Sequence, residues 1–383
     1  MGWNADVFNN FVKLNRGFDL PEKNIIHGEY PVVASTSVKD YHKDYKVNPP
    51  CVVTGRSGSL GSVQFISAKC WPLNTTLYVK DFKGNIPKFV YYFLKEMHLD
   101  NFNSGAGVPT LNQNHLHKLK IKIPDPPLQK KIAAVLSAYD DLIENNNRRI
   151  AILEKMAEEL YREWFVRLRF PGHEKTKFRK GIPDGWEIVK LGDLINMKMG
   201  QSPPSEFYNS SGDGLPFNQG VGTYGHRFPR KAMFCSCNGR IANQGDILFS
   251  VRAPVGRLNI ADCKMIIGRG LAALTHKAGY NSFLFYLLKT IFASEDIIGN
   301  GAIFNSVGKD ELYAFKILQP NSSLDKQFND NVRTLDKEIE FLLKAVEKLI
   351  TSRDRLLSRL MTGKLDVENL DIRFPKSMEE GIA

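Results

Sequence analysis

Residues 132–168 read IAAVLSAYDDLIENNNRRIAILEKMAEELYREWFVRL, and residues 328–364 read FNDNVRTLDKEIEFLLKAVEKLITSRDRLLSRLMTGK. Apolar side chains recur in both stretches at alternating steps of four and three residues, which is the pattern of a coiled-coil seam. Ten seam positions of the first stretch precede ten of the second by a constant 196 residues. This offset predicts an internal duplication that is built on two long helices.

The two predicted seams are equal in length and register. The first consists of Ile132, Leu136, Tyr139, Ile143, Asn146, Ile150, Leu153, Ala157, Leu160 and Trp164, and the second of Phe328, Val332, Leu335, Ile339, Leu342, Val346, Leu349, Arg353, Leu356 and Leu360. Asn146 stands where the second copy has Leu342, and a polar seam residue of this kind fixes register at some cost in stability.

A helix of this length is about 55 Å long, too long to bury its apolar stripe against a small domain. Because a globular segment separates the stretches, we predict an intramolecular antiparallel coiled coil whose two copies are related by a pseudo-twofold axis. The alternative is a pair of core helices in an ordinary bundle, but bundles seldom keep a strict seam this long.

The repeat extends beyond the helices. FVYYFLK at 89–95 matches FLFYLLK at 283–289, and Arg56 matches Arg252. Short β-type runs such as YPVV, CVVTG and DILFSV alternate with Gly, Pro and Asn, without a βαβ pattern, so the globules should be α+β. We predict a first globular domain at 1–127, a long helix at 128–169, a solvated linker at 170–183, a second globular domain at 184–322, a long helix at 323–363 and a C-terminal tail at 364–383.

Composition limits the class of protein. The 383 residues carry a net charge of +11, which favours a polyanionic partner. No apolar run approaches the roughly 18 residues of a membrane span, and the N-terminus lacks the pattern of an export signal, so we expect a cytoplasmic protein. The five cysteines are scattered, and Cys235 with Cys237 lacks a second pair at zinc-site spacing. We expect buried thiols and no metal site.

Several segments imitate catalytic motifs but lack a required part. Asn48-Pro49-Pro50-Cys51 resembles an amino-group methyltransferase signature, yet cysteine cannot stack on a flipped base as the usual aromatic residue does. The glycine-rich GRSGSLG at 55–61 is not followed by the Lys-Ser/Thr of a phosphate-binding loop. His115 and His117 have no obvious further metal ligand nearby, and no G-x-S-x-G elbow occurs. We therefore expect no catalysis by this chain.

Polar loops that recur in both copies suit nucleic-acid recognition. TGRSGSLGS and SVRAPVGR each place an arginine among small residues, where the backbone can approach a phosphate while the guanidinium reaches a base edge. Amide-rich turns can pair with adenine. Each loop alone is more often an ordinary turn, and the recurrence strengthens the interpretation. The candidate contacts are Arg56, Ser57, Ser59, Asn112, Asn114, Tyr224, Arg227, Arg230, Lys231, Arg252, Arg257, Arg269 and Asn305.

Four segments resemble the specificity subunit of type I restriction-modification systems. GDILFSVRAPVGRLNIAD at 245–262 and IGRGLAAL at 267–274 resemble the family's recognition-domain signature. IPDGWEIVKLGDL at 182–194 resembles the usual start of such a domain, and LLSRLMTGKLDV at 356–367 the usual close of its second helix. The resemblance covers nearly the whole chain. The first copy departs from it, because TGRSGSLGS stands where the second copy has SVRAPVG.

The resemblance implies two target-recognition domains that read a bipartite, asymmetric site on double-stranded DNA. It also implies two modification subunits, which supply S-adenosylmethionine and N6-adenine methylation, and restriction subunits driven by ATP. No cofactor is expected in this chain. Because major-groove windows on one face of DNA recur about every 34 to 36 Å, the helix length would set the gap between half-sites. Two alternatives remain open at this point, a free-standing DNA-binding regulator and a coiled-coil scaffold that binds protein.

Overall fold

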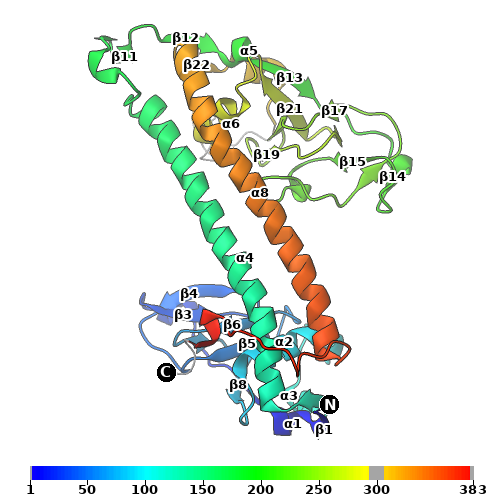
Figure 1. Ribbon diagram of the computed structural model, residues 1–383. Helices are drawn as coiled ribbons and strands as arrows, with labels where there is room; N and C mark the ends of the chain where they lie inside the picture. The colour runs from blue at the N-terminus through cyan, green and yellow to red at the C-terminus, as the bar shows by residue number, and fades with distance from the viewer. Residues whose placement is uncertain (1, 293–305, 380–383) are drawn as a thin grey trace. The chain divides into compact units, whose positions relative to one another are not determined.

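The computed structural model describes residues 2–292 and 306–379 (Figure 1). The chain divides into two units, Met1–Arg148 with Leu342–Ala383, and Arg149–Phe341. Each unit contains one globular domain and a part of both long helices, α4 (Pro126–Tyr161) and α8 (Ser322–Met361). A π-helix, Arg162–Val166, continues α4. The boundaries between the units fall inside the helices, whereas the sequence places domain limits at the helix starts.

The globular domain of the first unit is built from two sheets. A four-stranded antiparallel sheet has the order β2 (Lys13–Arg16), β8 (Thr76–Asp81), β5 (Cys51–Gly55) and β6 (Val63–Ile66). A three-stranded sheet has the order β4 (Val38–His42), β3 (Tyr30–Val33) and β7 (Trp71–Pro72), with β3 and β7 parallel. β1 (Trp3–Val7) pairs with β9 (Lys120–Pro124), which leads into α4.

The second unit repeats this arrangement. Its four-stranded antiparallel sheet has the order β13 (Ile195–Met199), β21 (Leu271–His276), β18 (Ile247–Ser250) and β19 (Leu258–Ile260). A five-stranded sheet has the order β14 (Tyr208–Asn209), β16 (Phe234–Cys235), β15 (Leu215–Asn218), β20 (Met265–Ile267) and β17 (Ile241–Ala242), with β15 and β20 parallel. β12 (Glu187–Lys190) pairs with β22 (Lys316–Gln319).

The helices recur in the same order. The first unit has α1 (Phe8–Phe11), α2 (Pro87–Glu96) and α3 (Gln113–His117), and the second has α5 (Leu191–Leu194), α6 (Asn281–Ile291) and α7 (Lys309–Ala314). The predicted internal repeat and α+β fold class are therefore confirmed. The copies differ most between the third and fifth strands of the first domain, where a link of 17 residues at 34–50 corresponds to 28 residues at 219–246.

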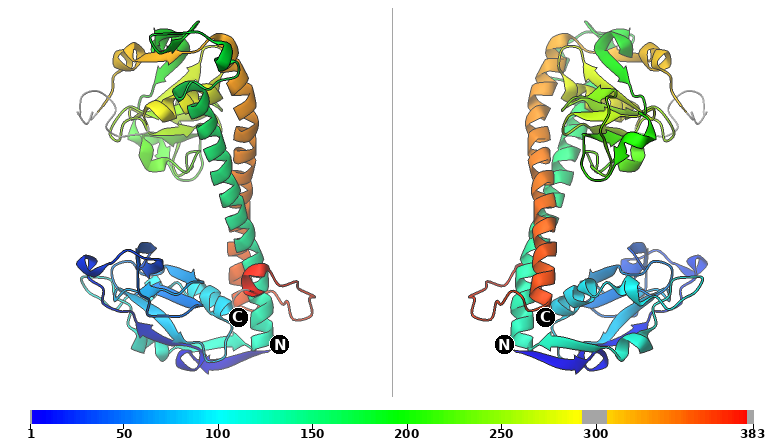
Figure 2. Two further views of the ribbon diagram at one scale, coloured as in Figure 1. Left: turned by 90° about the vertical axis from the view of Figure 1, so that its left-hand side faces the viewer. Right: turned by 90° about the vertical axis from the view of Figure 1, so that its right-hand side faces the viewer.

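Helices α4 and α8 run side by side and antiparallel within each unit (Figure 1, Figure 2). In the first unit Arg353 pairs with Asp140 at 2.7 Å. In the second unit Arg149 pairs with Glu338 at 2.8 Å, and the rings of Tyr161 and Phe328 are 5.6 Å apart. All twenty predicted seam residues are buried or half-buried. These positions therefore lie on the buried faces of both helices.

Each unit has its own apolar core, which the helices help to build. In the second unit Trp164 and Phe328 pack with Phe283 and Trp186. In the first unit α2 and α4 pack together with the end of α8, and Val367 and Met378 of the tail are buried in the same core. The predicted tail is therefore part of the first unit where the structure describes it. The predicted linker is largely exposed, apart from Phe170 and Pro183 at its ends.

Two segments that imitate catalytic motifs have structural roles in this fold. Asn48–Pro50 forms a bend before β5, and Cys51 is buried in that strand. His117 lies on α3, where its Nε2 accepts a hydrogen bond from the backbone N–H of Leu14 at 3.1 Å. Among the described residues, no helix is both long and apolar enough to span a membrane.

Candidate nucleic-acid interface

The Arg56 loop of the first unit follows β5 and depends on glycine. A Cβ on Gly55 would lie 1.9 Å from the carbonyl oxygen of Ser59, and Gly58 and Gly61 have φ angles of +83° and +85°. Only glycine adopts this left-handed conformation without strain, and only glycine allows the close approach. The sequence GRSGSLG therefore folds into a tight turn that exposes Ser59.

The structure brings the Arg56 loop against the segment that carries Asn112. Ser57 pairs with Thr110, and the N–H of Leu111 donates to the carbonyl of Arg56 at 2.8 Å. Arg56 is half-buried, and its Nη1 donates to the carbonyl of Asn74 at 3.3 Å. The side chain of Asn112 caps α3 by accepting from the N–H of Asn114 at 2.9 Å, and Asn114 is exposed. The five contacts predicted for the first unit therefore lie along one junction of loops. They are Arg56, Ser57, Ser59, Asn112 and Asn114.

The second unit forms the same junction after β18. The Ser250 hydroxyl donates to the carbonyl of Pro254 at 2.6 Å and accepts from the N–H of Arg257 at 2.8 Å, which closes the loop. Arg252 and Arg257 are exposed. The backbones of Arg252 and Ser306 form an isolated antiparallel β-bridge, as those of Ser57 and Thr110 do in the first unit. Asn305, the remaining predicted contact of this segment, lies outside the described residues.

A three-residue loop directly before β8 in the first unit, and before β21 in the second, completes each junction. In the second unit this loop is 268–270, whose Gly270 carbonyl accepts from the N–H of Val251 at 2.9 Å. Its Arg269 is exposed, and no described residue forms an ion pair with Arg269 or Arg252. In the first unit the corresponding loop is 73–75, whose Thr75 carbonyl accepts from the N–H of Arg56 at 2.8 Å. Arginine is thus concentrated at the junction of the second unit.

Two residues of these junctions were missed by sequence reasoning. Asn74 occupies the position in the first unit that Arg269 occupies in the second, and nothing in its sequence context marks it. Arg240 is exposed beside β20, where its carbonyl accepts from the N–H of Ile267 at 2.9 Å. A signal for Arg240 did exist, because it follows a glycine, as Arg56, Arg257 and Arg269 do.

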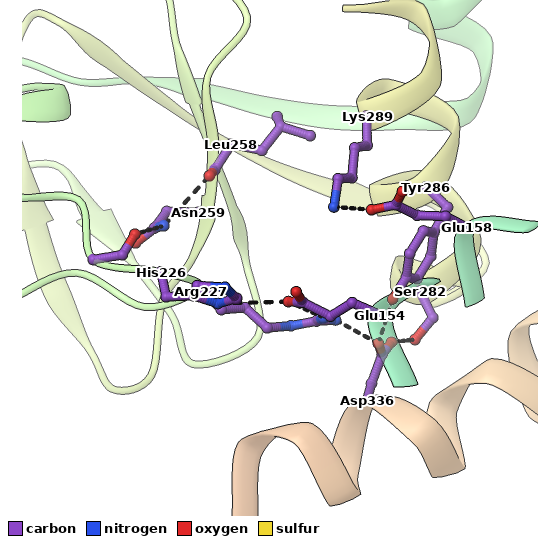
Figure 3. Close-up of polar contacts among 11 residues, drawn as sticks. Glu154, Glu158, His226, Arg227, Leu258, Asn259, Ser282, Tyr286, Lys289 and Asp336 are labelled. Carbon is purple, nitrogen blue, oxygen red and sulfur yellow. Dashed lines mark hydrogen bonds and ion pairs between the residues drawn. The ribbon is translucent and has the colours of Figure 1, made fainter. Parts of the chain in front are cut away.

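The segment 222–231 is only partly available to a ligand. Tyr224 is half-buried and donates from its hydroxyl to the carbonyl of Leu248 at 3.0 Å. Arg227 is 4% exposed and forms ion pairs with Asp336 and Glu154 (Figure 3). The sequence places both among the nucleic-acid contacts, and the structure corrects this, because their polar groups face the protein interior. Arg230 and Lys231 are exposed, and Lys231 pairs with Asp262 at 2.8 Å.

The cysteines are not arranged as a reactive or metal-binding site. All five are free, and three of them are buried. Hydrogen bonding with Cys70, together with burial, raises the pKa of Cys51, so this thiol stays protonated. No group of three or more His, Cys, Asp and Glu side chains in the described part of the chain could hold a metal ion.

The comparisons with known proteins agree with this arrangement. The model of the type I restriction modification DNA specificity domain matches residues 6–155 and 183–349, one copy in each half of the chain. A putative type I restriction enzyme MjaX specificity subunit of Methanocaldococcus jannaschii is 34% identical over 295 residues, which cover 74% of this chain and 69% of that protein. The MjaVIII specificity subunit of the same organism is 26% identical, covering 88% and 84% of the two chains.

A solved structure shows the same fold. The S subunit of a type I restriction-modification system from M. genitalium superposes with a TM-score of 0.65 at 19% identity, covering 94% of this chain and 96% of that one. The two matched segments cover most of the chain, and each contains one of the loop junctions described above. The chain therefore belongs to the family of type I restriction-modification DNA specificity subunits.

Proposed function

We propose that each unit reads one half of a bipartite, asymmetric DNA site, through the loop junctions around Arg56 and Arg252. The observation that carries this proposal is that one backbone frame recurs with different side chains. In the first unit the frame presents Ser59 and Asn114, and in the second Arg252 and Arg269. Two copies of a frame with different contact groups favour two different half-sequences.

The chemistry of these side chains suits direct readout of bases. An exposed guanidinium can bind the O6 and N7 of guanine with two hydrogen bonds, and an asparagine amide can pair with adenine in the same way. Arg252, Arg257, Arg269, Arg230 and Lys231 give the second unit a surplus of cations, which also favours phosphate contacts. Ser57, Ser59, Asn112 and Asn114 give the first unit mostly neutral hydrogen-bonding groups. We propose that both sets contact DNA.

We propose further that this chain binds DNA without catalysing a reaction. In this proposal two modification subunits carry S-adenosylmethionine and methylate adenine at N6, restriction subunits consume ATP, and the complex works in the cytoplasm. Exposed apolar side chains on the long helices support the docking of partner subunits there. They are Leu142, Ile152 and Met156 of α4 and Phe341 of α8. Contiguous exposed apolar groups mark interaction sites, and Ile152 and Met156 lie one turn apart on the same face of α4.

The test is single-molecule methylome sequencing of a host that lacks other methyltransferases. The chain is expressed with and without its presumed modification subunit. We expect N6-methyladenine on a split, asymmetric motif only when both proteins are present. If an assembled, cofactor-bound complex methylates nothing, the proposal fails. Tight, sequence-specific binding by the chain alone would then favour a free-standing regulator, and weak, salt-sensitive, sequence-blind binding would favour a protein scaffold.

A further inference from the structure

A buried ion-pair cluster in the second unit joins its globular domain to both long helices. Arg227, in the segment 222–231, directs Nη2 to Asp336 of α8 and lies with Nη1 3.7 Å from Glu154 of α4 (Figure 3). Asp336 also accepts hydrogen bonds from the hydroxyls of Ser282 at 2.6 Å and Tyr286 at 3.1 Å, both on α6. One guanidinium therefore connects a domain loop to a carboxylate on each helix.

The cluster is held together by charge around a buried guanidinium, and its two carboxylates are partly exposed. Burial alone would lower the pKa of Arg227, but Asp336, Tyr286 and Glu154 raise it above its ordinary value, so the guanidinium stays charged. The ring of Phe285 lies 4.9 Å from the guanidinium carbon and covers it. Moving the domain away from the helices would break these contacts, and removing one partner by substitution would leave the other charge buried and unpaired, which is strongly unfavourable.

The backbone connects this cluster to the loop junction. The carbonyl of Arg227 accepts from the N–H of Ile260 at 2.9 Å, and the carbonyl of Gly225 accepts from the Asn259 amide at 3.2 Å. Both partners lie on β19, the strand that directly follows the loop of Arg252 and Arg257. The segment of Arg227, which contacts the helices, is thus hydrogen-bonded to β19 and through this strand to the loop.

The first unit has the same carboxylate but a different cation. The Tyr92 hydroxyl donates to Asp140 at 2.6 Å, as that of Tyr286 donates to Asp336, but the arginine comes from Arg353 of α8. This cluster therefore links α4 to α8 and involves no recognition loop. Arg227 lies in the 28-residue link at 219–246, which corresponds to only 17 residues in the first unit.

We propose that Arg227 is a positioning residue, which fixes the orientation of the second target-recognition domain on α4 and α8. It thereby sets the spacing at which this domain reads its half-site. The inference rests on the proposed function, because it assumes that the domain reads one half of a split site. A residue with this role affects which spacer lengths are accepted and leaves the preferred half-sequences unchanged.

The test measures methylation by the complete complex with its modification subunits. The substrates are the wild-type site and sites with a spacer one base pair longer or shorter. The measured quantity is the ratio of methylation at sites with an altered spacer to methylation at the wild-type site. We expect Arg227→Met and Asp336→Asn to raise this ratio about tenfold, while a scrambled half-site still abolishes methylation. Arg227→Lys should restore part of the stringency, because it keeps one cation beside Asp336.

Lys289→Ala is the matched control, because Lys289 of α6 pairs with Glu158 of α4 in a more exposed position and also joins this domain to a long helix. It should leave spacer preference unchanged. If Arg227→Met does not fold, as judged by its thermal unfolding, Asp336→Asn and Arg227→Lys decide the question. An equal loss on all spacers would make the cluster purely stabilising and overturn the inference. If the wild-type complex methylates no split motif, the proposed function itself fails.

Discussion

In the first unit, the arginine that follows β5 is half-buried and donates to the carbonyl of Asn74, whereas the arginine that follows β18 in the second unit is exposed. Both sit in the same frame, because Arg56 and Arg252 each lie beside the segment that leads to the next short helix. The difference lies in the side chains, since the second unit adds Arg257 and Arg269 where the first offers hydroxyls and amides. Backbone hydrogen bonds thus preserve the fold while the contact groups change.

The buried clusters differ in the same way. Burial and Asp140 raise the pKa of Tyr92, and burial is also the main cause of the raised pKa of Tyr286, so both hydroxyls stay protonated and donate to a carboxylate. The cation is Arg353 of α8 in the first unit and Arg227 of a domain loop in the second. In the second unit this ion pair therefore joins the globular domain to the helices. In the first unit the corresponding ion pair joins one long helix to the other.

The largest expected effect concerns what the two units share, the long helices. Deleting one heptad from both α4 and α8 removes about 10 Å of helix, or about three base pairs of spacer. We expect the methylated motif to keep both half-sequences with a shorter unread gap, and the original site to be lost. Methylome sequencing measures this directly. If the half-sequences change and the gap does not, the helices do not set the spacing.

The two carboxylates should differ in their contribution to stability. Asp336→Ala should lower the free energy of unfolding by about 3 to 5 kcal/mol, because it leaves Arg227 buried without its main partner. Asp140→Ala should cost less, about 2 kcal/mol, because the side chain of Arg353 is more exposed and keeps Asp354 at 2.8 Å. Urea unfolding of both variants measures the difference. Equal costs would show that the clusters are energetically equivalent.

One pH effect on stability is expected from Asp325 in the second unit. Asp325 of α8 is 1% exposed, and burial raises its pKa to about 7 from an ordinary 3.8. The folded state then binds this proton more tightly than the unfolded state, so the contribution of Asp325 to stability falls as the pH rises from about 4 to about 7. Asp325→Asn should stabilise the protein by about 2 to 4 kcal/mol at pH 8 and not at pH 4.

Urea unfolding at both pH values measures this effect. The matched control is Asp330→Asn, which changes an exposed carboxylate on the same helix. A stabilisation that is equal at pH 4 and pH 8 would contradict the assignment to Asp325.

The smallest effect distinguishes the two arginines. Arg252→Ala should weaken binding by about 1 to 3 kcal/mol at one half-site only, as expected for loss of a base contact. Arg56→Ala should have a smaller effect on the other half-site, because its guanidinium is already half-buried and bonded to Asn74. Competition binding at fixed salt, with each half-site scrambled in turn, separates them. Equal loss on every sequence would make Arg252 a phosphate contact.

Much of the fold was predictable because its signals are local. YPVV and CVVTG coincide with β3 and β5, and FVYYFLK lies within α2, since apolar periodicity and flanking turn residues determine these elements. The two-residue strands β14, β16 and β17 are too short to show any periodicity. The burial of Arg227 could not be predicted, because it depends on Asp336, which is 109 positions away in sequence.

We propose that the two copies of one frame read the two halves of a site independently. The most direct test replaces residues 1–125 with a second copy of residues 184–321 and determines the methylated motif by single-molecule sequencing in a host with the modification subunit. If the copies read independently, we expect a symmetric motif, in which one wild-type half-sequence occurs twice as an inverted repeat. A motif that retains both wild-type half-sequences, or no methylation by a fully assembled complex, would contradict it.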